Sequence, residues 1–144
     1  MGSGSPDAKG RRVAAVVLAV YVAVLAVLTL WPTSVASPLL RPVQGFGPVQ
    51  ALVTYGRAEF LANIALFAPL GLLLSLILPS RLRYAVMPVG FLASVVIEGV
   101  QAVALPDRVP SVTDIVANTA GTCVGLLVVV ILELQAERAS RSPS

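Results

Sequence analysis

Four apolar stretches, each about as long as a membrane is thick, limit what this chain can fold into. A transmembrane helix needs about 20 mostly apolar residues, and the 144-residue sequence contains four such stretches separated by links that carry charge or proline. Only 12% of the residues are charged, whereas about a quarter are charged in a soluble domain. The sequence therefore predicts an all-α integral membrane protein with a single four-helix domain over residues 13–134. The predicted spans are 13–31, 59–78, 84–105 and 112–134.

The flanking segments are polar. Residues 1–12 and 135–144 are predicted to be cytoplasmic tails, the first of them disordered. The first span follows basic residues, as in a signal peptide, but its apolar run exceeds the usual signal core of roughly 7–15 residues. We favour an uncleaved helix that Pro32 ends, with the signal-peptide alternative open. Proline and glycine predict a loop over 33–57, in which 49–55 is either a surface helix or plain loop.

The basic residues predict the orientation, because cytoplasmic links carry an excess of Lys and Arg. An arrangement with both termini inside places seven of the ten basic residues in the cytoplasm: Lys9, Arg11, Arg12, Arg81, Arg83, Arg138 and Arg141. The other three, Arg41, Arg57 and Arg108, then lie outside. We interpret the positive charge as a topology signal and expect no nucleic-acid partner.

Two residue types limit the chemistry. The chain has no histidine, which removes the commonest general base and transition-metal ligand. Cys123 is the only cysteine, so no internal disulfide and no cysteine-rich metal site can form. We expect neither a metal nor a cofactor.

Polar residues recur at helical spacing in the last two spans. Ser94, Glu98 and Gln101 are spaced by four and three residues, so they share one helix face. A second stripe follows in the next span: Asp114, Asn118, Gly121 and Gly125. The two stripes are expected to face each other across a hairpin, near the outer side of the membrane. The predicted outer-leaflet polar cluster consists of Glu59, Asn63, Ser94, Glu98, Gln101, Arg108, Ser111, Asp114 and Asn118.

The cluster has two interpretations. Ionisable side chains are costly inside a membrane and mark functional sites, so we favour function for Glu98, Arg108 and Asp114. Amide side chains commonly hydrogen-bond helices together, which favours a structural role for the amide members. We further expect Arg108 to fold back over Glu98 and keep that carboxylate charged.

Small residues predict close helix packing. Gly121 and Gly125 are four residues apart, a spacing that lets helices approach closely. We expect them to pack within the monomer, against the preceding span near Gly90 and Ser94. Pro69 is expected to kink the second span, because proline removes a backbone hydrogen bond. The predicted packing positions are Pro69, Gly71, Gly121 and Gly125.

The order and spacing of these motifs resemble the VanZ-like family of bacterial membrane proteins. The matching pieces are NIALFAPLG from Asn63, Ser94 with EGVQ from Glu98, Arg108 with Ser111, DIVANTAG from Asp114, and Gly125. The family is named for an accessory protein of glycopeptide-resistance clusters that gives low-level resistance to teicoplanin. The resemblance implies a multi-pass protein of the bacterial plasma membrane that acts at the cell envelope, and it supplies no reaction. Members of the family often have an aromatic residue shortly after the glutamine, whereas residues 102–104 of this chain read AVA.

Three functions remain open from the sequence. The first is a binding protein that holds an outer-leaflet headgroup, a lipid-linked wall precursor or a lipoglycopeptide. The second is an enzyme on lipid-linked substrates, with Glu98 and Asp114 as acid and base. The third is a small transporter with a helix broken at Pro69, although four spans without repeats fit transport poorly. Membrane lipid is the expected partner in each case.

Overall fold

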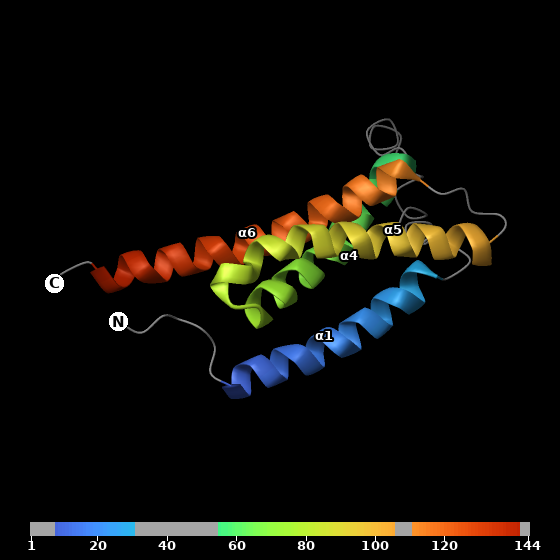
Figure 1. The fold of residues 1–144 in the computed structure, drawn as a ribbon. Coiled ribbons are helices and arrows are strands. Elements are labelled where there is room, and N and C mark those ends of the chain that lie inside the picture. The colour runs from blue at the N-terminus through green and yellow to red at the C-terminus, as the bar shows by residue number, and fades with distance from the viewer. Residues whose placement is uncertain (1–7, 31–54, 106–110, 142–144) are drawn as a thin grey trace, which may run out of the picture.

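The computed structural model describes residues 8–30, 55–105 and 111–141, and these contain helices and no strand (Figure 1). The helices are α1 (Ala8–Thr29), α4 (Tyr55–Ile77), the 3-10 helix η2 (Ser80–Ala85), α5 (Val86–Ala104) and α6 (Val112–Arg141). The predicted all-α class is confirmed. The suggested surface helix at 49–55 lies outside the described residues, apart from Tyr55, which begins α4.

Four helical segments are long and apolar enough to cross a membrane: Lys9–Thr29, Gly56–Ile77, Ser80–Ala104 and Val112–Arg141. A helix satisfies its own backbone hydrogen bonds, which is why apolar segments of this length are helical in lipid. The helices also continue into polar flanks, because backbone hydrogen bonding does not stop where apolar side chains end. As a result α1 begins five residues before the predicted span at Val13, and α6 runs seven residues past Leu134.

The helices alternate in direction along the chain (Figure 1). The beginning of α1 and the end of α6 lie at the same end of the bundle, on the left of the view. At the opposite end, α1 and α5 finish while α4 and α6 begin. We call this second end the pocket end. As a result α4 and α6 run parallel to each other, although α5 lies between them in the sequence.

The closest helix contact is between α4 and α6. A methyl group added at Gly121 would clash with the main-chain oxygen of Ile64, and one at Gly125 with the oxygen of Ala68. A methyl group at Gly71 would clash in turn with the oxygen of Thr122. The expected partner helix is therefore corrected: Gly121 and Gly125 pack against α4, while Thr122 fills the space beside Gly90 of α5. Pro69 lies inside α4, which continues to Ile77.

The remaining packing joins α1 to α4. Leu25, Phe67 and Leu70 form a buried apolar cluster between these two helices. The hydroxyl of Tyr21 donates a hydrogen bond to the main-chain oxygen of Leu66. Most other side chains of α1 are exposed, as expected for a helix that faces lipid.

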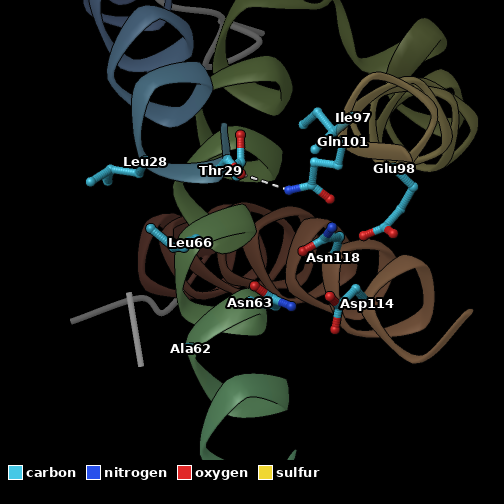
Figure 2. Close-up of a pocket in the computed structure, with 10 residues that line it drawn as sticks. All are labelled: Leu28, Thr29, Ala62, Asn63, Leu66, Ile97, Glu98, Gln101, Asp114 and Asn118. Carbon is cyan, nitrogen blue, oxygen red and sulfur yellow. Dashed lines mark hydrogen bonds between the residues drawn. The ribbon is translucent and has the colours of Figure 1, made fainter. Parts of the chain in front are cut away.

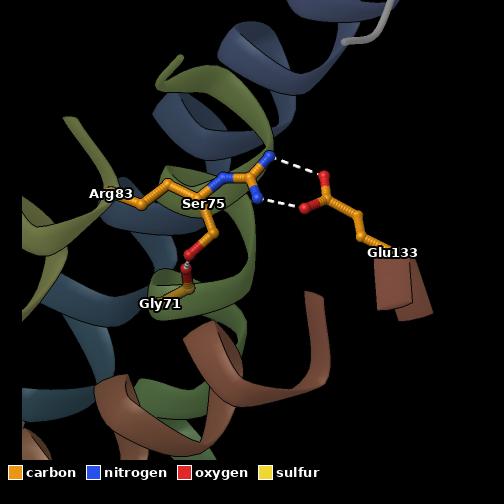
Figure 3. Close-up of polar contacts among 4 residues, drawn as sticks. All are labelled: Gly71, Ser75, Arg83 and Glu133. Carbon is orange, nitrogen blue, oxygen red and sulfur yellow. Dashed lines mark hydrogen bonds and ion pairs between the residues drawn. The ribbon is translucent and has the colours of Figure 1, made fainter. Parts of the chain in front are cut away.

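An ion pair connects η2 to α6 at the end of the bundle opposite the pocket end (Figure 3). Both terminal nitrogens of Arg83, in η2, bond to the carboxylate of Glu133 in α6, and Nη2 lies 2.6 Å from Oε1. The Arg83 side chain is 15% exposed and that of Glu133 is 37% exposed. This two-point contact fixes the link between α4 and α5 against the last helix.

Candidate binding site

A small polar pocket lies at the pocket end, where all four long helices meet (Figure 2). Its lining residues are Leu28 and Thr29 from α1, Ala62, Asn63 and Leu66 from α4, Ile97, Glu98 and Gln101 from α5, and Asp114 and Asn118 from α6. The cavity measures about 20 Å³, which is room for one water-sized group. Half of the lining side chains carry a carboxylate or an amide.

The α5 side of the pocket follows from the spacing of its polar residues. Ser94, Glu98 and Gln101 share one face of the helix and are 0%, 6% and 3% exposed. That face meets α6, and the exposed faces of α5 carry valine, leucine and phenylalanine instead. The helix thus directs its apolar residues outward and its polar residues toward the neighbouring helices.

Glu98 contacts the start of α6. Its Oε2 accepts a 2.9 Å hydrogen bond from the main-chain N–H of Ser111, just before that helix begins. The Ser111 hydroxyl accepts a 3.4 Å bond from the N–H of Asp114, as a helix-capping serine does. A carboxylate is favourable at this place, because unpaired N–H groups give the start of a helix a partial positive charge.

An amide contact joins the two polar stripes. Asn118 donates a 2.8 Å hydrogen bond from Nδ2 to the hydroxyl oxygen of Ser94. Thr122, one turn further along α6, is fully buried and donates to the main-chain oxygen of Asn118. Ser94 and Ser111 therefore hold the lining residues Asn118 and Glu98 in place by hydrogen bonds, although neither serine lines the pocket.

The α1 side of the pocket was missed by sequence reasoning. Gln101 donates a 2.6 Å hydrogen bond from Nε2 to the main-chain oxygen of Thr29. Thr29 is 8% exposed and lines the pocket. A polar residue near the end of the first apolar run was the available signal, but the acceptor is a backbone atom, which every residue carries.

The structure brings together five of the predicted cluster residues in the pocket lining: Asn63, Glu98, Gln101, Asp114 and Asn118. Glu59 is half-buried one turn before Asn63 and does not line the pocket. Arg108, with its expected pairing to Glu98, lies outside the described residues. In the part of the chain that the structure describes, no group of three His, Cys, Asp or Glu side chains could hold a metal ion.

Comparison with known proteins identifies one family. The family model described as VanZ/LLP1 matches residues 18–133, a range that contains all the residues that line the pocket. No curated protein and no solved structure gives a significant match to the sequence.

Proposed function

Because this chain belongs to the VanZ/LLP1 family, we propose that it acts at the bacterial cell envelope as a binding protein of the plasma membrane. The pocket would hold part of a polar headgroup, from an outer-leaflet lipid or a lipid-linked wall precursor. One observation carries the proposal: polar side chains from four helices converge on one pocket of an apolar bundle. Polar groups within membrane spans mark functional sites, because lipid penalises them.

The orientation of the bundle supports a ligand from the outer leaflet. Among the described basic residues, Lys9, Arg11, Arg12, Arg81 and Arg83 belong to the end of the bundle opposite the pocket, whereas Arg57, in the first turn of α4, belongs to the pocket end. Arg138 and Arg141, near the end of α6, also belong to the end opposite the pocket. The positive-inside rule assigns that end to the cytoplasm. The pocket would then open toward the outer leaflet, where lipid-linked wall precursors and lipoglycopeptides meet. Low-level teicoplanin resistance would follow if the protein changed how the drug reaches such a precursor.

The contacts favour binding over catalysis. The Ser94 hydroxyl could serve as a nucleophile only beside a base, but it is fully buried and contacts the amide of Asn118, which is not a base. Glu98 is engaged with the main-chain N–H of Ser111. A cavity of about 20 Å³ also admits only one small group. We therefore place an enzyme on lipid-linked substrates second and a small transporter third.

Glu98→Gln tests the proposal. The variant keeps an oxygen for the Ser111 N–H and removes the negative charge, so we expect it to fold and to lose affinity for purified wall-precursor lipids. The measurement is saturable binding of these lipids to purified protein in nanodiscs, with product analysis in the same samples. Turnover by the unchanged protein would support the enzyme alternative instead.

Two further variants separate folding from binding. Glu137→Gln changes an exposed carboxylate of α6 far from the pocket and should bind like the unchanged protein. Glu98→Ala also removes the acceptor for Ser111 and should lower the free energy of unfolding by about 1–3 kcal/mol. Teicoplanin susceptibility of cells expressing each variant gives the matching phenotype. If Glu98→Gln binds as well as the unchanged protein and gives the same susceptibility, the pocket is not the binding site.

A further inference from the structure

Two buried oxygens in the pocket have no hydrogen-bond partner among the residues that the structure describes. Gln101 is 3% exposed, and its Nε2 bonds to a main-chain oxygen, which can only accept. The amide orientation is therefore fixed, and Oε1 is the atom left without a donor. Asn118 is also 3% exposed, and its Oδ1 is likewise without a donor. Buried polar atoms without partners are rare in folded proteins, and a functional role or a bound water or ion commonly explains them.

Both oxygens belong to residues that line the same pocket, with Glu98 and Asp114 beside them (Figure 2). The described lining residues include no Lys or Arg. Glu98 is 6% exposed, and its only described hydrogen-bond donor is the N–H of Ser111. The two amide oxygens and the Glu98 carboxylate thus present acceptors to the pocket, and this arrangement favours a hydrogen-bond donor with a positive charge.

The size of the pocket narrows the choice. A cavity of about 20 Å³ holds one non-hydrogen atom of the size of a water oxygen. A primary ammonium has that size and three N–H donors, and the cavity is partly open, so a substituent can extend outward. A trimethylammonium group is larger and has no N–H to donate.

We propose that the pocket binds a primary ammonium group. Its N–H groups donate hydrogen bonds to Gln101 Oε1, Asn118 Oδ1 and the carboxylate of Glu98. This inference rests on the proposed function and specifies the headgroup chemistry. The ammonium has two sources in an envelope: the amine of a phospholipid headgroup, or the amino side chain of a wall-precursor peptide.

Ethanolamine and choline, at equal ionic strength, test the chemistry on the purified full chain in detergent. We expect ethanolamine to raise the unfolding temperature in a saturable manner, and choline and sodium chloride to leave it unchanged. Glu98→Gln should weaken ethanolamine binding by about tenfold or more, because a charged hydrogen bond is lost. Asn118→Asp adds a negative charge at the same place and should strengthen it, while Glu137→Gln should have no effect.

Three outcomes would overturn the inference. Equal responses to ethanolamine and choline would mean nonspecific attraction of cations. A response to sodium alone would mean a metal-ion site, and no response to any of them would mean that a water molecule fills the pocket.

Native mass spectrometry from mixed-lipid nanodiscs distinguishes the two sources. Retention of phosphatidylethanolamine over phosphatidylcholine assigns the ammonium to a phospholipid. Retention of a wall-precursor lipid that is lost when its peptide amine is acetylated assigns it to the precursor. Precursor retained equally after acetylation would refute the ammonium inference while leaving the proposed function intact. Ethanolamine binding without any binding of the precursor would support the ammonium inference and exclude the precursor as the ligand.

Discussion

The side-chain amide of Gln101 donates a hydrogen bond to the main-chain oxygen of Thr29, the last residue of α1. The donor and acceptor are 2.6 Å apart, and both residues are buried. The bond connects α1 to α5 at the pocket, whereas the main packing partner of α1 is α4. One side chain therefore both lines the pocket and holds the first helix beside it.

Gln101→Leu is expected to loosen the end of α1. The change leaves the Thr29 oxygen without its donor, and an unpaired buried acceptor costs about 1–3 kcal/mol. The free energy of unfolding in detergent should fall by that amount. Ser75→Ala is the matched control, because Ser75 is buried and its hydroxyl donates within its own helix, to the Gly71 oxygen. Equal decreases in the free energy of unfolding of both variants would show that the hydrogen bond between α1 and α5 does not stabilise the fold more than a bond within one helix.

Gly125→Ala should destabilise the protein although alanine is the better helix former. The added methyl group would clash with the main chain of α4 at Ala68, so the two helices must separate. Overpacking of this kind costs about 1–3 kcal/mol. Gly99→Ala is the control, since an added methyl group at Gly99 meets no atom within 4 Å. Thermal unfolding in detergent compares the two, and a Gly125→Ala variant as stable as Gly99→Ala would contradict the close contact of α4 and α6.

The ion pair of Arg83 and Glu133 should respond unequally to its two neutralising variants. Glu133→Gln leaves the more buried partner, Arg83, without a counter-charge, and the loss should approach the roughly 3 kcal/mol of a broken buried pair. Arg83→Gln leaves a carboxylate that is 37% exposed, so its loss should be nearer the roughly 1 kcal/mol of an exposed pair. Chemical unfolding of both single variants and the double variant measures the coupling. Additive losses would mean that the two side chains do not interact.

Reporter fusions test the orientation. Fusions after Arg83 and at Ser144 should report cytoplasm, and a fusion after Arg108 should report the outside, because the basic residues favour the cytoplasmic side. A fusion after Arg12 provides the cytoplasmic reference. A cytoplasmic signal after Arg108 would place the pocket at the inner leaflet and remove the link to outer-leaflet ligands.

Much of the fold could be predicted from apolar length alone. A run of about 20 apolar residues can only be a helix in lipid, and four such runs give four spanning helices. The ends could not be predicted in this way. Ala8 and Arg141 are helical because polar residues outside the membrane can extend a helix at little cost.

The candidate site, like the fold, could be predicted only in part from the sequence. Spacing alone puts Ser94, Glu98 and Gln101 on one helix face, and this face is buried. The spacing of small residues predicts that another helix packs closely against them, but it does not identify that helix. Gly121 was therefore expected beside α5, whereas it contacts Ile64 of α4. The Arg83 and Glu133 pair joins residues 50 positions apart, and no local pattern predicts such a pair.

The parallel contact of α4 and α6 has a consequence for biosynthesis. Both helices must be in the membrane before their contact can form, and the ribosome delivers α6 after α4 and α5. Until then Glu98 of α5 faces lipid or the translocation machinery without the main-chain N–H of Ser111, which the start of α6 provides. The inserted helices therefore remain without this contact until α6 has been delivered. An interruption of translation before Val112 would leave a polar membrane segment that quality-control proteases can recognise.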